Sequence, residues 1–152
     1  MPVILADVNV LLYAFRADYR DHSRYRDWLQ EAVSGPEPFG ISTLVLSAFI
    51  RIVTHPRIHI EPSPRDAAIE FTDRLLQQTA SVTVSPGAEH WLIFIKLCNQ
   101  SRAVGNLVAD AYLAALAIES GSEWVTTDRD YSRFPRLRWR HPFDKSSRIN
   151  PA

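Results

Sequence analysis

Hydrophobic positions along the chain alternate between short continuous runs and longer stretches with helical spacing. The first run, residues 3–6, is apolar at consecutive positions and stops at Asp7, which predicts a strand buried on both faces. Apolar or β-branched runs at residues 39–42, 81–84 and 123–128 predict three more short strands. Because helical patterns separate these runs, and parallel neighbours need helical crossovers, the sequence predicts an α/β sandwich with a parallel sheet.

One predicted helix, residues 43–54, is apolar nearly all round, with Ser47 and Arg51 as its polar interior positions. This composition predicts a buried helix. A charge on such a helix is costly unless it is paired or reaches a solvent-filled cleft, so Arg51 is a candidate for holding an acid or a phosphate. In the alternative interpretation, its stem lies along the core and its guanidinium ends in water.

A second helix, predicted for residues 106–118, is rich in Ala and Leu and carries Asp110 as its only charge. Burying a carboxylate in an apolar helix is costly, so we expect a positive group to meet Asp110. The helix dipole alone favours an anion near the first turn by at most about 1 kcal/mol, which is too small to account for a buried acid.

Capping signals predict where two of the helices begin or end. Ser85 and Pro86 predict the start of the helix after the third strand, because serine caps a helix and proline fits its first turn. Ser120 and Gly121 predict the end of the Asp110 helix, because glycine accepts the left-handed conformation beyond a helix end.

Two acids follow predicted strands directly: Asp7 follows the first and Asp128 ends the fourth. The carboxyl ends of parallel strands form one crevice, where ligands bind in open α/β sheets. Each acid also has a local alternative, since Asp frequently caps a helix or initiates a turn. The same placement on two strands indicates that the acids converge, and Asp110 adds a third.

Three carboxylates in one crevice predict a bound cation, because they raise each other's pKa unless a positive charge neutralises them. With no histidine or thiolate in the set, Mg²⁺ or Mn²⁺ fits better than zinc. Mg²⁺ also leaves positions for a substrate phosphate and an attacking water, so the predicted reaction is phosphodiester hydrolysis. Asn9, Thr126 and Thr127 are candidates to hydrogen-bond the acids or the metal-bound waters.

Composition limits the class of protein further. A chain of 152 residues with 46% hydrophobic and 22% charged residues predicts one globular domain over residues 1–152. No apolar run approaches the roughly 20 residues of a membrane span, and no signal peptide is recognisable, so we expect a cytoplasmic protein. Cys98 is the single cysteine, which excludes a cysteine-based zinc cluster. A net charge of zero argues against a uniformly basic nucleic-acid-binding surface.

Near the C-terminus, residues 135–142 alternate apolar and basic side chains. Arg136, Arg138 and Arg140 flank two apolar residues, Leu137 and Trp139, which predicts an edge strand. The arginines then either block aggregation at this edge or contact phosphates of an RNA backbone, with a base stacked on Trp139.

Four blocks in this order resemble the PIN domain. They are Asp7–Ala14, Leu46–Arg51, Asp110–Ala117 and Thr126–Tyr131. With the segment Val53–Arg57, the chain most resembles the VapC toxins of bacterial toxin–antitoxin pairs. The resemblance implies a three-layer α/β/α sandwich with four to five strands, Mg²⁺- or Mn²⁺-dependent endoribonuclease activity, a homodimer, and neutralisation by a VapB antitoxin.

The resemblance also assigns site residues. Asp7, Asp110 and Asp128 fall on the family's acidic positions, and they would be both the catalytic residues and the metal ligands. The family's usual glutamate, three residues before Arg51, is Ala48 here, so the site has one acid fewer. Arg51 and the three C-terminal arginines would bind RNA.

Two alternatives remain open from the sequence. The Ala48 departure allows a catalytically weakened module of the same fold that binds RNA or a protein. A phosphotransferase or phosphatase with Asp7 as nucleophile is disfavoured, because Asn9 stands where such enzymes have a second aspartate.

Overall fold

Six strands form one sheet in the structure, a computed structural model that describes residues 2–152. The strands are β1 (Ile4–Ala6), β2 (Phe39–Ile41), β3 (Ser81–Thr83), β4 (Glu123–Val125), β5 (Arg138–Arg140) and β6 (Arg148–Ile149). The helices are α1 (Val8–Phe15), α2 (His22–Ser34), α3 (Thr43–Val53), α4 (Arg65–Gln77), α5 (His90–Ser101), α6 (Asn106–Ser120) and a 3-10 turn η1 (Arg129–Arg133).

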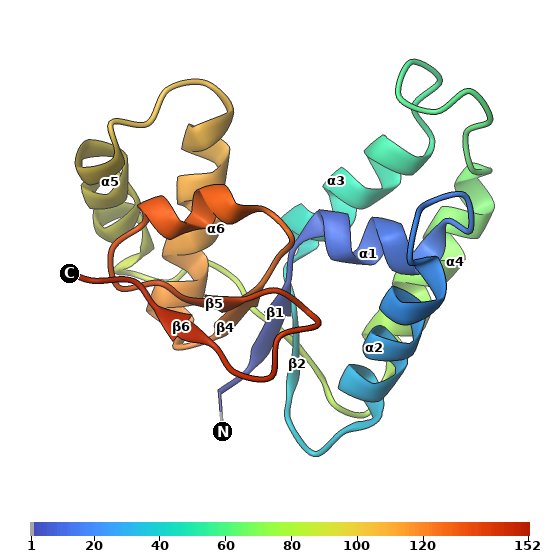
Figure 1. The fold of residues 1–152 in the computed structure, drawn as a ribbon, viewed down its shortest axis with the longest axis horizontal. Coiled ribbons are helices and arrows are strands. Elements are labelled where there is room, and N and C mark those ends of the chain that lie inside the picture. Colours follow the sequence, from blue (N-terminus) through green and yellow to red (C-terminus); the bar gives the residue numbers. More distant parts are fainter. Residues whose placement is uncertain (1) are drawn as a thin grey trace.

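The strands lie in the order β3-β2-β1-β4-β5-β6, and all neighbours are parallel except the antiparallel pair β5 and β6. Helices α1 to α4 gather on one side of the sheet, and α5 and α6 lie on the other (Figure 1). The predicted α/β/α sandwich with a parallel sheet is therefore confirmed. The two-residue strand β6 gave no recognisable sequence signal and was not predicted.

The core centres on β1 and β4, the two strands in the middle of the sheet. Both are buried along their whole length, as expected for parallel strands covered by helices on both faces. The largest fully buried side chain is that of Trp124 on β4. This packing fixes the ends of β1 and β4. Asp7 follows β1 directly, but β4 ends at Val125, so Asp128 lies three residues beyond the strand that it was predicted to end.

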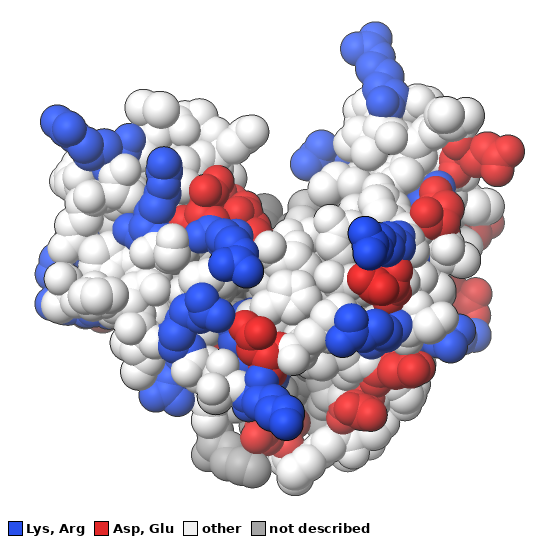
Figure 2. All heavy atoms as spheres, in the orientation of Figure 1, with Lys and Arg blue, Asp and Glu red and all other residues white. Residues whose placement is uncertain are grey.

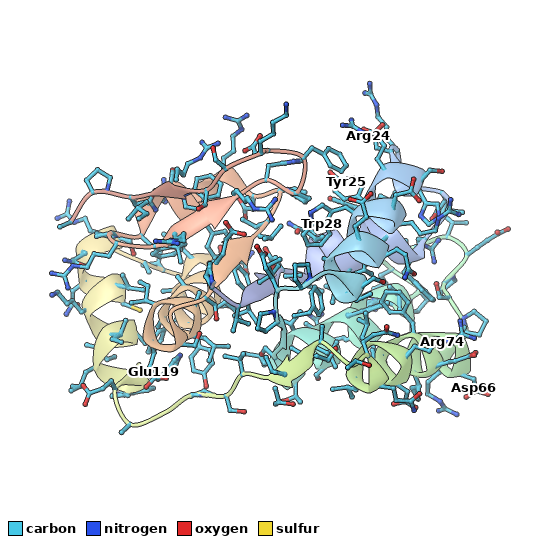
Figure 3. The ribbon with its side chains drawn as sticks, turned by 90° about the horizontal axis from the view of Figure 1, so that it is seen from below. Arg24, Tyr25, Trp28, Asp66, Arg74 and Glu119 are labelled. Atoms are coloured by element: carbon cyan, nitrogen blue, oxygen red, sulfur yellow. The ribbon has the colours of Figure 1, made fainter. Side chains whose placement is uncertain are left out.

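The predicted helix start at Ser85 and Pro86 is wrong, because α5 begins only at His90. The carboxylate of Glu119, near the end of α6, instead accepts hydrogen bonds from the backbone N–H groups of Gly87 (2.7 Å) and Glu89 (2.9 Å). Figure 3 shows Glu119 beside the segment that leads into α5. A contact over about thirty residues thus holds this segment in irregular structure. The predicted end of α6 at Gly121 is confirmed, with Gly121 in the left-handed conformation (φ 67°).

Helix α3 is not buried all round, contrary to the prediction. Its inner face is buried at Val45, Leu46 and Phe49, but the side chain of Leu44 is 50% exposed and Arg51 is exposed. The apolar outer face lines a cleft, which is described below.

The segment at residues 138–140 is a strand but not an edge strand, because β6 pairs with its outer side. None of the helices within residues 2–152 is long and apolar enough to cross a membrane.

Gly40 on β2 has no room for a larger side chain. A Cβ atom there would lie 2.7 Å from Val3 Cγ1, 3.1 Å from Val84 Cγ2 and 3.2 Å from the carbonyl oxygen of Ile4. We predict that Gly40→Ala lowers the free energy of unfolding by about 1 to 3 kcal/mol, because the sheet must shift to admit the methyl group. Urea denaturation measures this difference, and an unchanged midpoint would contradict the tight packing of β1 against β2.

Candidate active site

Asp7 lies between β1 and α1 and is 5% exposed. One carboxylate oxygen accepts a hydrogen bond from the backbone N–H of Val8, and the other accepts from Oγ1 of Thr126, each at 2.7 Å. Asp7 is therefore the N-cap of α1, as the local alternative proposed, and it also lies at the carboxyl edge of the sheet. The cap of a helix and the acid at the end of a central strand are therefore the same residue.

Burial raises the pKa of Asp7 from its ordinary value of 3.8 to about 6. The hydrogen bonds from Thr126 and Val8 lower this pKa, and the charges of Asp110 and Asp128 raise it further. In the absence of a bound cation, the ionised carboxylate of Asp7 therefore lowers the stability of the folded protein at neutral pH.

Thr126 connects the first acid to the third. While its hydroxyl donates to Asp7, the same oxygen accepts a hydrogen bond from the backbone N–H of Asp128 at 3.0 Å. The Asp128 carboxylate in turn accepts from the N–H of Asp130 at 2.8 Å and caps η1. Thr127 is half-buried between them, and its hydroxyl makes no hydrogen bond within residues 2–152.

Asp110 projects from α6 and is half-buried. Burial and the charge of Asp128 raise its pKa above the ordinary value. The hydroxyl of Tyr131 donates a hydrogen bond to Asp110 Oδ1 at 3.3 Å. Tyr131 is 1% exposed, and burial together with the charges of the three acids raises its pKa well above the ordinary value, so it stays a donor. Tyr131 was not predicted as a site residue, since its only signal was an aromatic residue shortly after Asp128.

No side chain within residues 2–152 supplies the positive partner expected for Asp110. Within residues 2–152 the ion pairs join other groups, and none includes Asp7, Asp110 or Asp128. In the part of the chain that the structure describes, the three acids therefore carry negative charge that no ion pair neutralises.

The donor set fits a divalent cation that keeps much of its water. No group of three or more His, Cys, Asp and Glu side chains within residues 2–152 is arranged to hold a metal ion directly. Mg²⁺, however, takes only one or two protein carboxylates and fills its remaining positions with water and substrate oxygens. Asn9 Oδ1 is buried without a hydrogen-bond partner, so it can accept from a water bound to such an ion.

A cleft of about 700 Å³ opens between α3 on one wall and α6 on the other, and none of the three acids is among the described residues that line it. Its lining includes Val8 and Ala109, each the chain neighbour of an acid. Figure 2 shows a hollow between two lobes, with acidic side chains on one wall and basic side chains on both sides. Arg51 and Ala48 both line the α3 wall, one helical turn apart, so the position of the missing glutamate faces the cleft.

The C-terminal arginines do not join this cluster. Arg140 forms a largely buried ion pair with Glu123 at 2.8 Å and also donates to the carbonyls of Pro142 and Asp144, so its guanidinium already has partners within the fold and its contact with RNA stays a prediction. The ring predicted to stack on RNA, that of Trp139, is 3% exposed and is covered by Arg148 at 4.7 Å.

Arg136 and Arg138 are exposed, but they lie toward the amino end of β5, whereas the acids follow carboxyl ends. Their contact with RNA stays a prediction, at a distance from the acids.

Comparison with known proteins gives one family. The family model of the PIN domain matches residues 4–137. The chain is 43% identical over 147 residues to VapC ribonuclease Mb2897 of Mycobacterium bovis, covering 97% of this chain and 100% of that protein. It is 38% identical over 140 residues to ribonuclease VapC25 of Mycobacterium tuberculosis, covering 92% of this chain and 99% of that protein.

Solved structures share the fold at low sequence identity. VapBC2 from Rickettsia felis, bound to a DNA fragment from their promoter, superposes with a TM-score of 0.67 at 19% identity, covering 91% of this chain and 98% of that chain. VapBC-1 from nontypeable Haemophilus influenzae gives a TM-score of 0.66 at 17% identity, covering 93% and 99%.

Arg140 and Arg138 lie on the same strand, β5, and differ in burial, so substitutions at the two positions can be compared directly. We predict that Arg140→Gln lowers the free energy of unfolding by about 3 kcal/mol, because it leaves the buried carboxylate of Glu123 without its partner. Arg138→Gln should change it by less than about 0.5 kcal/mol, since the side chain is exposed. Guanidinium denaturation of both variants makes the comparison; equal effects would contradict the buried pair.

Asp7 should destabilise the metal-free protein at neutral pH. Because its pKa is raised in the folded state, the folded protein holds this proton more tightly than the unfolded chain. Its contribution to stability is therefore present below pH 3.8 and is lost as the pH rises through about 6, a loss of about 3 kcal/mol.

In chelator at pH 7.5, Asp7→Asn should accordingly be more stable than wild type by about 1 to 3 kcal/mol, and near pH 4 the difference should shrink toward zero. Thermal unfolding at both pH values tests this. A variant that is less stable at pH 7.5 would show that the charged carboxylate is not held at a cost.

Proposed function

This chain belongs to the PIN-domain family and, within it, to the VapC ribonucleases, and we propose that it is a Mg²⁺-dependent endoribonuclease, the toxin of a pair neutralised by a VapB antitoxin. The observation that carries this proposal is the set of three carboxylates at Asp7, Asp110 and Asp128, which no side chain within residues 2–152 neutralises in an ion pair. The chain neighbours of two of them, Val8 and Ala109, line an open cleft. The names of the relatives supply the substrate class, RNA.

Each acid has a role in this proposal. Asp7 and Asp110 carry raised pKa values that a bound Mg²⁺ or Mn²⁺ would relieve, and Asp128 adds the third charge of the cluster. When bound, the ion supplies an activated water and stabilises charge on the phosphate. Thr126 holds the Asp7 carboxylate toward the crevice through its 2.7 Å hydrogen bond, and Asn9 accepts from a water in the site.

Arg51 is the side chain that would bind RNA from the α3 wall of the cleft. It is exposed on the cleft wall and forms no ion pair within residues 2–152, so its guanidinium is available to a phosphate. Ala48 leaves the wall with one carboxylate fewer, and we expect weaker metal binding than in a site of four acids.

We propose two protein partners. Structural neighbours of this chain are VapBC complexes, which supports a VapB-type antitoxin here. Large apolar side chains exposed on α3, α5 and the loop before α6 support a homodimer, because such a surface is covered by a second copy in many assemblies. They are Leu44, Trp91, Leu92, Ile95 and Val104. We place the protein in the cytoplasm, where its RNA substrate would be.

One observation favours a second candidate function. Ala48 removes an acid from the cleft wall, so a module of the same fold that binds RNA or a partner protein without cutting RNA is the alternative. Such a module would bind RNA equally well with a chelator present.

The test is cleavage of total RNA by the purified chain, free of antitoxin, with Mg²⁺, with Mn²⁺ and with a chelator. We predict metal-dependent fragments that Asp7→Asn and Asp110→Asn reduce at least about 100-fold, because each removes a carboxylate from the metal site. Asp73→Asn, which changes an exposed acid on α4, is the matched control and should cleave like wild type.

Cleavage that persists in chelator, or in the Asp7→Asn variant, would overturn the metal-dependent mechanism. Metal-independent RNA binding without any cleavage by wild type would favour the binding module.

A further inference from the structure

The segment that follows Asp128 is hydrogen-bonded to Asn150, the residue after strand β6. The match to the PIN family ends at residue 137, so both strands, β5 and β6, lie entirely beyond the matched region. The side chain of Asn150, directly after β6, turns inward and is 8% exposed. Its side-chain amide lies within hydrogen-bond distance of the backbone of Tyr131.

Asn150 satisfies every polar position of its side-chain amide. Its Nδ2 donates to the carbonyl oxygens of Tyr131 and Phe134, both at 2.8 Å, and its Oδ1 accepts from Trp139 Nε1 at 2.8 Å. Its backbone also bonds to Arg136 and Leu137. Buried amides with complete hydrogen bonding hold their neighbours in one arrangement. Asn150 therefore fixes the position of the Tyr131 backbone.

Tyr131 connects Asn150 to Asp110. Its ring packs between Trp124 (centroids 5.4 Å apart) and Phe134 (5.7 Å), and its hydroxyl points at Asp110 Oδ1. At 3.3 Å this hydrogen bond is long, so it contributes little to stability, but it is the one hydrogen bond that the Asp110 carboxylate accepts within residues 2–152.

We propose that Tyr131 and Asn150 are positioning residues for the metal site: the Tyr131 hydroxyl orients the Asp110 carboxylate, and Asn150 holds Tyr131 where it can do so. The inference rests on the proposed function for the identity of the site. Hydrogen bonds from neighbouring groups typically change metal affinity or activity about 10- to 100-fold when they are removed.

A purely structural role for these residues predicts a different result. Burial of the ring would then account for Tyr131, and completion of the small cluster around Trp139 would account for Asn150. Loss of either would lower stability but leave the metal affinity of the folded protein unchanged.

Tyr131→Phe separates the two roles, because it keeps the ring and removes only the hydroxyl. We expect Mn²⁺ affinity, measured by calorimetry on the full chain, to fall about 10-fold, and kcat to fall with it, while the unfolding midpoint stays near that of wild type. Tyr25→Phe is the control: it removes a hydroxyl from another buried tyrosine, which packs against Phe143 on the far side of α2 from α4 (Figure 3). It should leave Mn²⁺ affinity unchanged.

Asn150→Ser tests the second residue in the wild-type and Tyr131→Phe backgrounds. If Asn150 acts through the Tyr131 hydroxyl, the substitution weakens Mn²⁺ binding only where that hydroxyl is present, which is a coupling that a double-mutant cycle measures. Ile149→Ala, a change of the exposed neighbour on β6, is the control for disturbance of the strand. If Asn150→Ser does not fold, Tyr131→Phe still decides the role of the hydroxyl.

The outcomes distinguish this inference from the proposed function. Wild-type cleavage together with unchanged Mn²⁺ affinity in Tyr131→Phe would overturn the positioning role and leave the nuclease intact. Weaker Mn²⁺ binding in Tyr131→Phe, from a wild-type chain that cuts no RNA, would support the positioning role while the proposed function fails.

Discussion

The structure depends on one buried carboxylate, that of Asp7, which no cationic side chain within residues 2–152 neutralises. Asp7 sits between the central strand β1 and helix α1, so its position is fixed by the best-packed part of the molecule. Two hydrogen bonds reduce the cost of its charge, but burial and two neighbouring acids raise its pKa to about 6. A fold that retains such a group at its centre gives up stability unless a cation binds there, and we interpret this cost as the basis of metal recruitment.

Hydrogen bonds at the ends of the strands convert separate acids into one site. Thr126 joins Asp7 to the backbone at Asp128, and Tyr131 reaches from η1 to Asp110 on α6. The resulting arrangement leaves the α3 wall free to present Arg51 and the small side chain of Ala48 to the same cleft. Residues that follow β1 and β4 thus supply two of the charges and α6 supplies the third, while α3 and α6 shape the space in which a substrate would lie.

The sequence predicted the features that short-range patterns determine. Continuous apolar runs gave the parallel strands, and strand ends placed Asp7 and Asp128 at one edge of the sheet. Features set by contacts distant in sequence were missed: the late start of α5 depends on Glu119, and the burial of Arg140 depends on Glu123. The outer face of α3 was predicted to be buried because composition alone does not show that a cleft, rather than another helix, lies against it.

The most direct measurement of the central claim is anomalous diffraction from crystals of the protein soaked in Mn²⁺. We predict one or more manganese peaks in the crevice bounded by Asp7, Asp110 and Asp128, with the Asp7 carboxylate, or a water bound to it, next to the ion. An empty crevice at millimolar Mn²⁺, or manganese bound only at surface acids elsewhere, would contradict the view that these three carboxylates form a metal site.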